Sequence, residues 1–435
     1  MCSLIKQFIV KLSSKEIFKV FSFTAMSAVI KMITNLVSVK VLAVFVGPSG
    51  VALLGQLINF SSIVQTIGSG GINRGVTKYT AEYYEQPINI KYLLSTSTKI
   101  SIFLSVIIGF ILIFFSEFLS LKILKTIEYS FVFVIFGFTL CFYTLNNQLL
   151  SILNGFKEYR KFVIVNIISS FVGLIFTVIL VYLANIKGAL IAAVTFQSIT
   201  FFVSLFFVIK SPWFKKDFFL SKYNFVVANK LFHYSIMSIV SAFTVPISQI
   251  LVRDFLTSAI SLDAAGIWEG MNRISGMYLM LVTSSLGVYY LPKLSGIKTK
   301  KLLRKEIFNV YKFVLPIVMA SIIIIFVSKE LIVKLIFSDS FMEMQSLFSY
   351  QLIGDFFKIS AWVLSFVLLA KAKTKLFIIS EILFSLLFVI LSFICISRFG
   401  LKGASIAYML NYMLYFIIMV VIFRKLLFKK YSNGK

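Results

Sequence analysis

Long apolar runs alternate with short polar segments along the whole chain. Twelve of these runs are long enough to cross about 30 Å of hydrocarbon as α-helices. They lie at residues 17–38, 50–70, 92–115, 129–152, 162–183, 188–209, 231–256, 266–290, 308–327, 346–369, 376–396 and 403–423. The pattern predicts an all-α polytopic membrane protein with twelve transmembrane helices.

Polar residues inside several of these runs recur every three or four positions, so that they form stripes on single helix faces. The stripes include Lys31 and Asn35 in the first run, Gln56 and Asn59 in the second, Gln249 and Arg253 in the seventh, Asn272 and Arg273 in the eighth, and Lys358 in the tenth. Ionisable residues within a bilayer are costly and usually face a cavity or a partner. We therefore expect the stripes of the first, second, seventh and eighth helices to line one cavity.

The charged residues within the runs include two carboxylates with basic neighbours on the same helix. Glu269 and Arg273 are spaced i,i+4, while Asp355 and Lys358 are spaced i,i+3, so each pair could form an ion pair within its helix. Arg253 is about one turn from the outer end of its run, from which a long side chain could reach the interface.

Lys31 is near the middle of its run and has no acidic partner at helical spacing. Together with Lys31, the basic residues Arg253, Arg273 and Lys358 outnumber the acidic Glu269 and Asp355. The cavity should therefore carry net positive charge. Arg and Lys together suit phosphate oxygens, so we expect an anionic substrate, with Glu269 holding Arg273 in place.

The net charge of +27 follows the membrane topology. We count 28 Lys and Arg residues in the termini and loops of one side and 8 in the alternate loops. The positive-inside rule then places both termini in the cytoplasm. Topology therefore explains the basic charge without a nucleic-acid partner. The three cysteines, at positions 2, 141 and 395, predict neither a disulfide framework nor a metal site, and no cofactor is expected.

Two short sequence matches recur at almost the same offset. "IKGALIAA" from Ile186 matches "LKGASIAY" from Leu401, an offset of 215, and Gly50 of "GPSGVALLGQLIN" aligns with Gly266 of "AAGIWEGMNRIS", an offset of 216. We infer a duplicated unit and predict two pseudo-symmetric six-helix lobes, residues 1–215 and 216–435, around a central cavity. In transporters built this way, one half rocks against the other around the substrate site.

Enzymatic chemistry has little support in the sequence. The chain has one histidine, its "GSGG" segment lacks the strand and helix that flank a phosphate-binding loop, and its outer loops are short. Membrane enzymes that act on lipid-linked glycans generally hold their catalytic centre in a long external loop. The protein is therefore expected not to be an enzyme.

Several short motifs together resemble a known family. They are "VGPSG" after the first run, "GVTKY" at Gly75–Tyr79, "AGIW" at Ala265–Trp268, "YYLPKLS" at Tyr289–Ser295, "KFVLP" at Lys312–Pro316 and "LIGDFFK" at Leu352–Lys358. With the twelve spans, they resemble the O-antigen and enterobacterial-common-antigen type flippases of the multidrug/oligosaccharidyl-lipid/polysaccharide exporter superfamily.

This resemblance implies a flippase for lipopolysaccharide or related surface polysaccharides. Its substrate would be an undecaprenyl-pyrophosphate-linked oligosaccharide, moved from the cytoplasmic to the periplasmic leaflet of the bacterial inner membrane by alternating access. The resemblance also implies an ion gradient, for which Glu269 and Asp355 are the candidate carriers of a proton or sodium ion. A polysaccharide polymerase and a chain-length regulator are the protein partners to consider, besides membrane lipid.

Three other functions are weighed against this one. A cation-coupled multidrug antiporter of the same superfamily should display unpaired carboxylates for organic cations, whereas this chain has more bases than acids within its spans. A membrane enzyme acting on lipid-linked glycans is disfavoured by the short outer loops. A flippase for peptidoglycan precursors commonly carries more than twelve spans.

Overall fold

The computed structural model describes residues 26–371 and 373–428, and every regular element in these two ranges is a helix. The helices group into two compact units. The first contains the chain up to Val41 and Ser61–Ile239, and the second contains Leu42–Phe60 and Val240–Lys435. Because α2 (Gly47–Gly68) and α9 (Phe225–Ala259) run across these boundaries, each supplies residues to both units.

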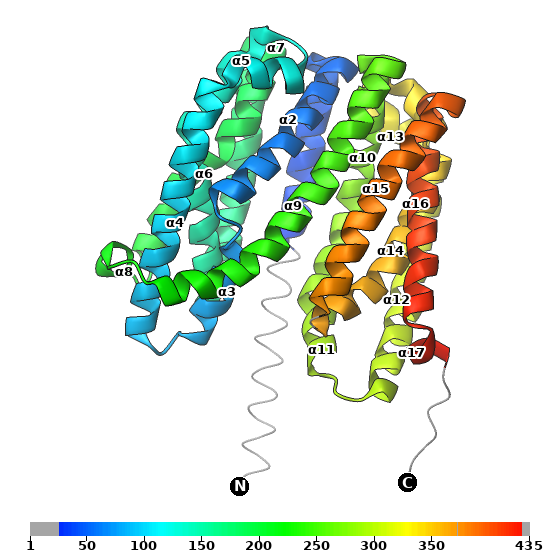
Figure 1. The fold of residues 1–435 in the computed structure, drawn as a ribbon. Coiled ribbons are helices and arrows are strands. Elements are labelled where there is room, and N and C mark those ends of the chain that lie inside the picture. The colour runs from blue at the N-terminus through cyan, green and yellow to red at the C-terminus, as the bar shows by residue number, and fades with distance from the viewer. Residues whose placement is uncertain (1–25, 372, 429–435) are drawn as a thin grey trace, which may run out of the picture. The chain divides into compact units, whose positions relative to one another are not determined.

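The first unit is built around long helices that run side by side, with α4, α6 and α7 at its centre (Figure 1). Its elements are the helix over Met26–Phe45, which continues into the second unit, part of α2, α3 (Asn73–Glu82), α4 (Pro87–Phe114), α5 (Ser116–Leu119), η1 (Ser120–Leu124), η2 (Ile127–Tyr129), α6 (Ser130–Gly155), α7 (Tyr159–Ile209), α8 (Asp217–Leu220) and the start of α9.

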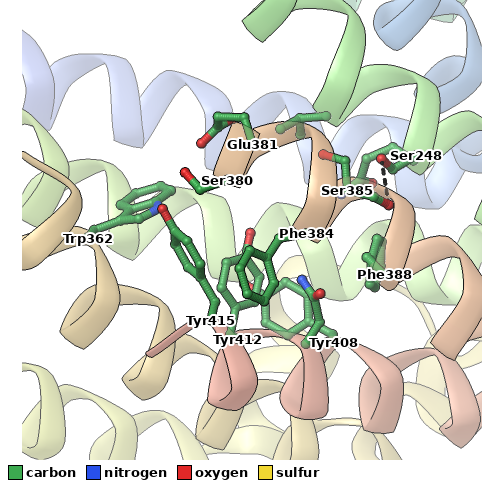
Figure 2. Close-up of a pocket in the computed structure, with 13 residues that line it drawn as sticks. Ser248, Trp362, Ser380, Glu381, Phe384, Ser385, Phe388, Tyr408, Tyr412 and Tyr415 are labelled. Carbon is green, nitrogen blue, oxygen red and sulfur yellow. Dashed lines mark hydrogen bonds between the residues drawn. The ribbon is translucent and has the colours of Figure 1, made fainter. Parts of the chain in front are cut away.

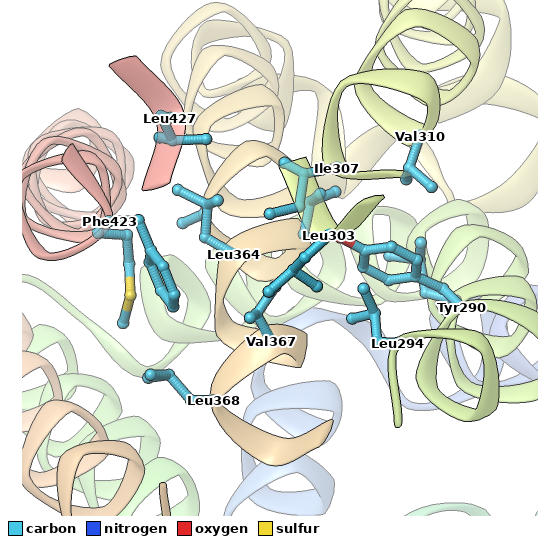
Figure 3. Close-up of a cluster of buried hydrophobic side chains, with 14 of the residues drawn as sticks. Tyr290, Leu294, Leu303, Ile307, Val310, Leu364, Val367, Leu368, Phe423 and Leu427 are labelled. Atoms are coloured by element: carbon cyan, nitrogen blue, oxygen red, sulfur yellow. The ribbon is translucent and has the colours of Figure 1, made fainter. Parts of the chain in front are cut away.

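The second unit packs α14, α15 and α16 against one another, and α12 against α14. Besides the parts of α2 and α9, its elements are α10 (Leu262–Ser285), η3 (Leu286–Tyr290), α11 (Leu291–Gly296), α12 (Lys300–Val327), α13 (Lys329–Ile336), η4 (Asp339–Ser346), α14 (Phe348–Ala370), α15 (Thr374–Phe399), α16 (Leu401–Ile422) and α17 (Arg424–Phe428). Figure 3 shows one buried cluster in which Tyr290, Leu303, Ile307, Leu364 and Phe423 pack together. This core joins α12, α14 and the end of α16.

The helices agree with the prediction of twelve spans. Ten of the described helices are long and apolar enough to cross a membrane. One of the ten, α7, is 51 residues long and is interrupted by non-helical backbone at Ala184 and Asn185, so it holds the fifth and sixth predicted spans. The eighth predicted span is α10, which is less apolar because it carries Asp263, Glu269 and Arg273.

The predicted end of the first span, residue 38, is wrong. The helix continues to Phe45 because the segment after Ser38 is apolar apart from Lys40 and contains no Pro or Gly before Gly47, which adopts a positive φ of 64°. The predicted start, residues 17–25, lies outside the described residues.

The sequence repeat corresponds to the same local geometry in both units. Asn185 has φ 46° and ψ −124°, and Gly400, which is 215 residues later, has φ 60° and ψ −141°. Three residues after each turn, a glycine packs against the preceding helix: a Cβ on Gly188 would lie 1.8 Å from the Leu180 carbonyl oxygen, and one on Gly403 would lie 2.2 Å from that of Cys395. These shared features support a duplication, while the lobe boundaries at residues 215 and 216 stay a prediction.

Candidate functional site

A buried guanidinium is held where α9 meets α2. Arg253 is only 1% exposed, and its Nη1 donates to Gln56 Oε1 at 2.7 Å. The amide of Asn59, one turn further along α2, lies 3.2 and 3.3 Å from the two terminal nitrogens of Arg253 and accepts from both when its oxygen faces them. The guanidinium also lies 5.7 Å from the ring centroid of the buried Trp268. The expectation that Arg253 could reach the interface is therefore wrong.

Glu269 joins this arginine to a second one. Its Oε2 accepts a hydrogen bond from Arg253 Nη2, and its Oε1 accepts from Arg273 Nε at 3.2 Å. The Glu269–Arg273 pair within α10 is thus present, as the spacing predicted. The longer-range partner, Arg253, comes from another helix and was not predicted. Arg253, Glu269 and Arg273, hereafter the arginine cluster, place one carboxylate between two guanidiniums. Asp254 adds a second carboxylate nearby, because its Oδ1 accepts from Gln56 Nε2 at 3.4 Å.

The close packing of α2 against the arginine cluster depends on a glycine. A Cβ on Gly55 would lie 2.6 Å from Glu269 Cδ and 3.0 Å from Arg253 Cζ. At the start of α10, a Cβ on Gly266 would lie 1.8 Å from the carbonyl oxygen of Pro48, and the Ser49 hydroxyl donates to Asp263. The backbone contact at Gly266 brings α2 and α10 together, and the missing side chain at Gly55 leaves room for the polar side chains of the cluster.

Arg253 and Arg273 differ in their capacity to bind a ligand. Arg253 is enclosed and uses both terminal nitrogens within the protein, while its fully enclosed Nε has no hydrogen-bond partner among the described residues. The Arg273 side chain is 16% exposed, and its Nη2 has no hydrogen-bond partner among the described residues. The neighbouring Asn272 Nδ2 also has none. Buried donors without hydrogen-bond partners are costly. A bound anion at this position would accept hydrogen bonds from Arg273 Nη2 and Asn272 Nδ2.

A second polar group surrounds Asp355 on α14, which is fully buried. Its Oδ2 accepts from the hydroxyls of Ser275 at 2.7 Å and Tyr278 at 2.5 Å, while its Oδ1 accepts from that of Tyr408 at 2.7 Å. Three hydroxyl donors therefore replace the water that a carboxylate loses on burial. We call Asp355 and these three residues the aspartate cluster.

Lys358 is linked to the aspartate cluster through a tyrosine. Its Nζ lies 3.1 Å from the Tyr408 hydroxyl oxygen, the same group that donates to Asp355. The expected direct pair of Lys358 with Asp355 does not occur among the ion pairs of the described residues. The ammonium instead lies 4.9 Å from the ring centroid of Tyr412 and 5.0 Å from that of Trp362, where cation–π attraction stabilises it.

The remaining predicted site residues lie apart from these groups. Lys31 and Asn35 are exposed on the first helix, in the part that belongs to the first unit, so their expected place in a shared cavity stays a prediction. Gln249 on α9 lines a pocket of the second unit instead of joining the arginine cluster. The same pocket contains Glu381, an intramembrane carboxylate that the sequence reasoning overlooked although its position in an apolar run could have revealed it.

Comparison with known proteins places the chain in a family. Residues 17–298 match the family described as polysaccharide biosynthesis protein. The chain belongs to this family. It is similar to the lipid III flippase of Escherichia coli strain K12, with 27% identity over 394 residues that cover 91% of this chain and 95% of the relative. The lipid III flippase of Shigella flexneri matches to the same extent. The resemblance to flippases is thereby confirmed.

Solved structures of multidrug transporters share the fold of this chain. An inward-facing multidrug resistance MATE family transporter of the MOP superfamily superimposes with a TM-score of 0.79 at 14% identity, over 91% of this chain and 94% of that one. A MATE protein in the straight conformation gives a TM-score of 0.70 at 14% identity, over 94% of both chains. At this identity the similarity concerns the fold alone, and it confirms the prediction of an all-α polytopic architecture.

Proposed function

We propose that this protein is a flippase that moves undecaprenyl-pyrophosphate-linked oligosaccharide repeat units from the cytoplasmic to the periplasmic leaflet of the bacterial inner membrane. The similarity to the lipid III flippases along 91% of the chain carries the proposal, because it extends across both units. Family membership and the superfamily fold support transport in place of catalysis. Both termini would face the cytoplasm, as the distribution of basic residues predicts.

The arginine cluster supplies a physical basis for choosing an anionic lipid. Arg273 Nη2 and Asn272 Nδ2 are donors without a hydrogen-bond partner among the described residues, and the two guanidiniums of the cluster share one carboxylate, Glu269. We assign pyrophosphate binding to these two residues. Arg253 acts as a positioning residue, because it holds Glu269, which in turn orients the Arg273 guanidinium. Lys31 and Asn35 are further proposed contacts from the first unit.

For ion coupling we favour Asp355 over Glu269. Glu269 accepts from two guanidiniums, so a proton or sodium ion could bind there only by displacing a buried ion pair. Asp355 accepts hydrogen bonds only from hydroxyl groups. These hydroxyls can rotate away, so that the carboxylate becomes free to bind an ion. A polysaccharide polymerase and a chain-length regulator remain proposed partners, and the identity of the surface polysaccharide, O-antigen or a related one, belongs to the proposal too.

Transbilayer movement of a radiolabelled undecaprenyl-pyrophosphate oligosaccharide in proteoliposomes tests this function. Accessibility of the sugar to an added glycosidase reports which leaflet the lipid occupies. We expect movement that depends on the protein and accelerates under a pH or sodium gradient. Protein-free liposomes and liposomes with the Asp355→Asn variant are the controls. Uptake of an organic cation without any movement of the lipid would favour the multidrug antiporter instead.

A further inference from the structure

The second unit contains a pocket between α9, α14, α15 and α16, away from the residues assigned to pyrophosphate (Figure 2). Six aromatic rings contribute to its wall: Trp362, Phe384, Phe388, Tyr408, Tyr412 and Tyr415. The polar lining residues are Ser248, Gln249, Ser380, Glu381, Ser385 and Asn411. In Figure 2, Trp362 and Tyr415 lie near one another on one side, with Glu381 and Ser380 beside them. Aromatic walls with a few converging polar groups are typical of small-molecule sites.

Two buried polar groups of this pocket have no hydrogen-bond partner among the described residues. The buried Asn411 Oδ1 accepts no hydrogen bond from them. The Tyr415 hydroxyl lies beside Ser365 and Ser380 but forms no hydrogen bond of good geometry with any described residue. Glu381 is half-buried in the pocket wall, where its carboxylate feels the charge of Lys358. Because native proteins satisfy nearly all buried polar groups, Asn411 Oδ1 and the Tyr415 hydroxyl point to a ligand with both donors and acceptors.

The charge around the pocket disfavours a cation as that ligand. The Lys358 ammonium already lies 4.9, 5.0 and 5.3 Å from the ring centroids of Tyr412, Trp362 and Tyr408. A second cation against these rings would be repelled by Lys358, and Glu381 is the only acidic side chain among the lining residues. Asp355 is fully buried behind Tyr408 and already accepts three hydrogen bonds.

The size of the pocket fits a single sugar ring. Its volume is about 100 Å³. This is several times the roughly 10–15 Å³ that a cavity needs to hold one water molecule. A pyranose ring with its substituents has a comparable extent, whereas a complete oligosaccharide is several times larger.

We propose that this pocket is a subsite for one neutral sugar ring of the transported oligosaccharide, an inference that rests on the proposed function. Sugar hydroxyls donate to Glu381 and to Asn411 Oδ1, and they accept from the Tyr415 hydroxyl. The C–H face of the ring packs against an aromatic face, whose quadrupole is negative and so attracts the weakly positive hydrogens. The pyrophosphate contacts of Arg273 would then select the lipid carrier, while this subsite selects among sugars.

Binding of simple glycosides tests the subsite directly. Purified full-length protein in detergent is titrated with the methyl glycosides of glucose and of N-acetylglucosamine, and tryptophan emission is recorded. We expect a saturable change with at least one glycoside, and we expect the Trp362→Phe variant to lose it while Trp213 and Trp268 remain. A response to sodium chloride or tetramethylammonium alone would overturn the assignment to a sugar. A glycoside response that persists in Trp362→Phe would place binding elsewhere and would overturn it too.

Conservative variants separate binding from folding. Tyr415→Phe removes one neutral hydrogen bond and should weaken glycoside binding about 2- to 10-fold, and Glu381→Gln should weaken it by about 10-fold or more. Tyr290→Phe is the matched control, because the Tyr290 hydroxyl is also buried and has no hydrogen-bond partner in the described part of the chain, but it does not line the pocket. Equal affinities in all three variants and the wild-type protein would contradict the subsite.

Transport measurements distinguish failure of the subsite from failure of the proposed function. If the wild-type protein flips the lipid-linked oligosaccharide but Tyr415→Phe and Glu381→Gln leave its apparent affinity and its preference among sugars unchanged, the subsite is refuted and the flippase stands. If the wild-type protein flips no lipid-linked oligosaccharide, the proposed function fails. The glycoside titration remains interpretable in that case, because it does not depend on transport.

Discussion

Replacing Glu269 with Gln should destabilise the second unit strongly. The Glu269 side chain is 12% exposed and accepts from both Arg253, which is 1% exposed, and Arg273. At the 3.2 Å separation of Glu269 Oε1 from Arg273 Nε, and with an effective dielectric constant of about 20, the gross attraction is about 5 kcal/mol. A glutamine has one acceptor oxygen and would turn an amide N–H₂ toward a guanidinium. Removing one partner of a buried ion pair typically costs about 3–5 kcal/mol.

The loss should appear as a lower melting temperature. For a unit of roughly 200 residues, each kcal/mol shifts the melting temperature by about 2–4 °C, so Glu269→Gln should lower it by about 6–20 °C. The assay heats purified protein in detergent and measures the fraction that remains monodisperse by size-exclusion chromatography. Glu330→Gln is the matched control, because Glu330 is 62% exposed in its pair with Lys334 and such pairs contribute little. Equal melting temperatures for the two variants would refute the buried arginine cluster.

Three further outcomes follow from the geometry. Gly55→Ala should lower the melting temperature, because the added Cβ would lie 2.6 Å from Glu269 Cδ. Gly276→Ala should not lower it, because no atom lies within 4 Å of the Cβ added there, and equal effects of the two variants would contradict the packing of α2. Tyr408→Phe removes one hydrogen bond from the buried Asp355 and should reduce ion-gradient-driven transport several-fold at normal protein level; undiminished gradient dependence would argue against Asp355 as the coupling residue. Lys31→Ala should slow transbilayer movement more than Lys31→Arg does, as measured by initial rates in proteoliposomes, and equal rates for both would exclude a role for its charge.

The helices were predictable because membrane spans follow from hydrophobic length. The break inside α7 was also placed correctly, since "ANIKG" interrupts the apolar run at Asn185. The end of the first helix was missed because no residue between Ser38 and Phe45 breaks a helix, and charge and polarity alone suggested a loop there.

Pairings within one helix were easier to predict than pairings between helices. The i,i+4 spacing gave the Glu269–Arg273 contact, because helix geometry brings such residues together. The contact of Arg253 with Glu269 depends on how α9 packs against α10, which no local pattern specifies. The i,i+3 spacing of Lys358 and Asp355 was misleading, since the Tyr408 hydroxyl from α16 lies between the two groups.

The most direct test of the account is the ratio of two transport rates. One substrate is the undecaprenyl-pyrophosphate oligosaccharide, and the other carries the same oligosaccharide on undecaprenol without phosphate. We predict that the wild-type protein strongly prefers the pyrophosphate lipid and that Arg273→Gln reduces this preference by about 10- to 150-fold, the range expected for a lost charged hydrogen bond. Equal rates for the two lipids in the wild-type protein, or an unchanged preference in Arg273→Gln, would contradict recognition of the anion by Arg273.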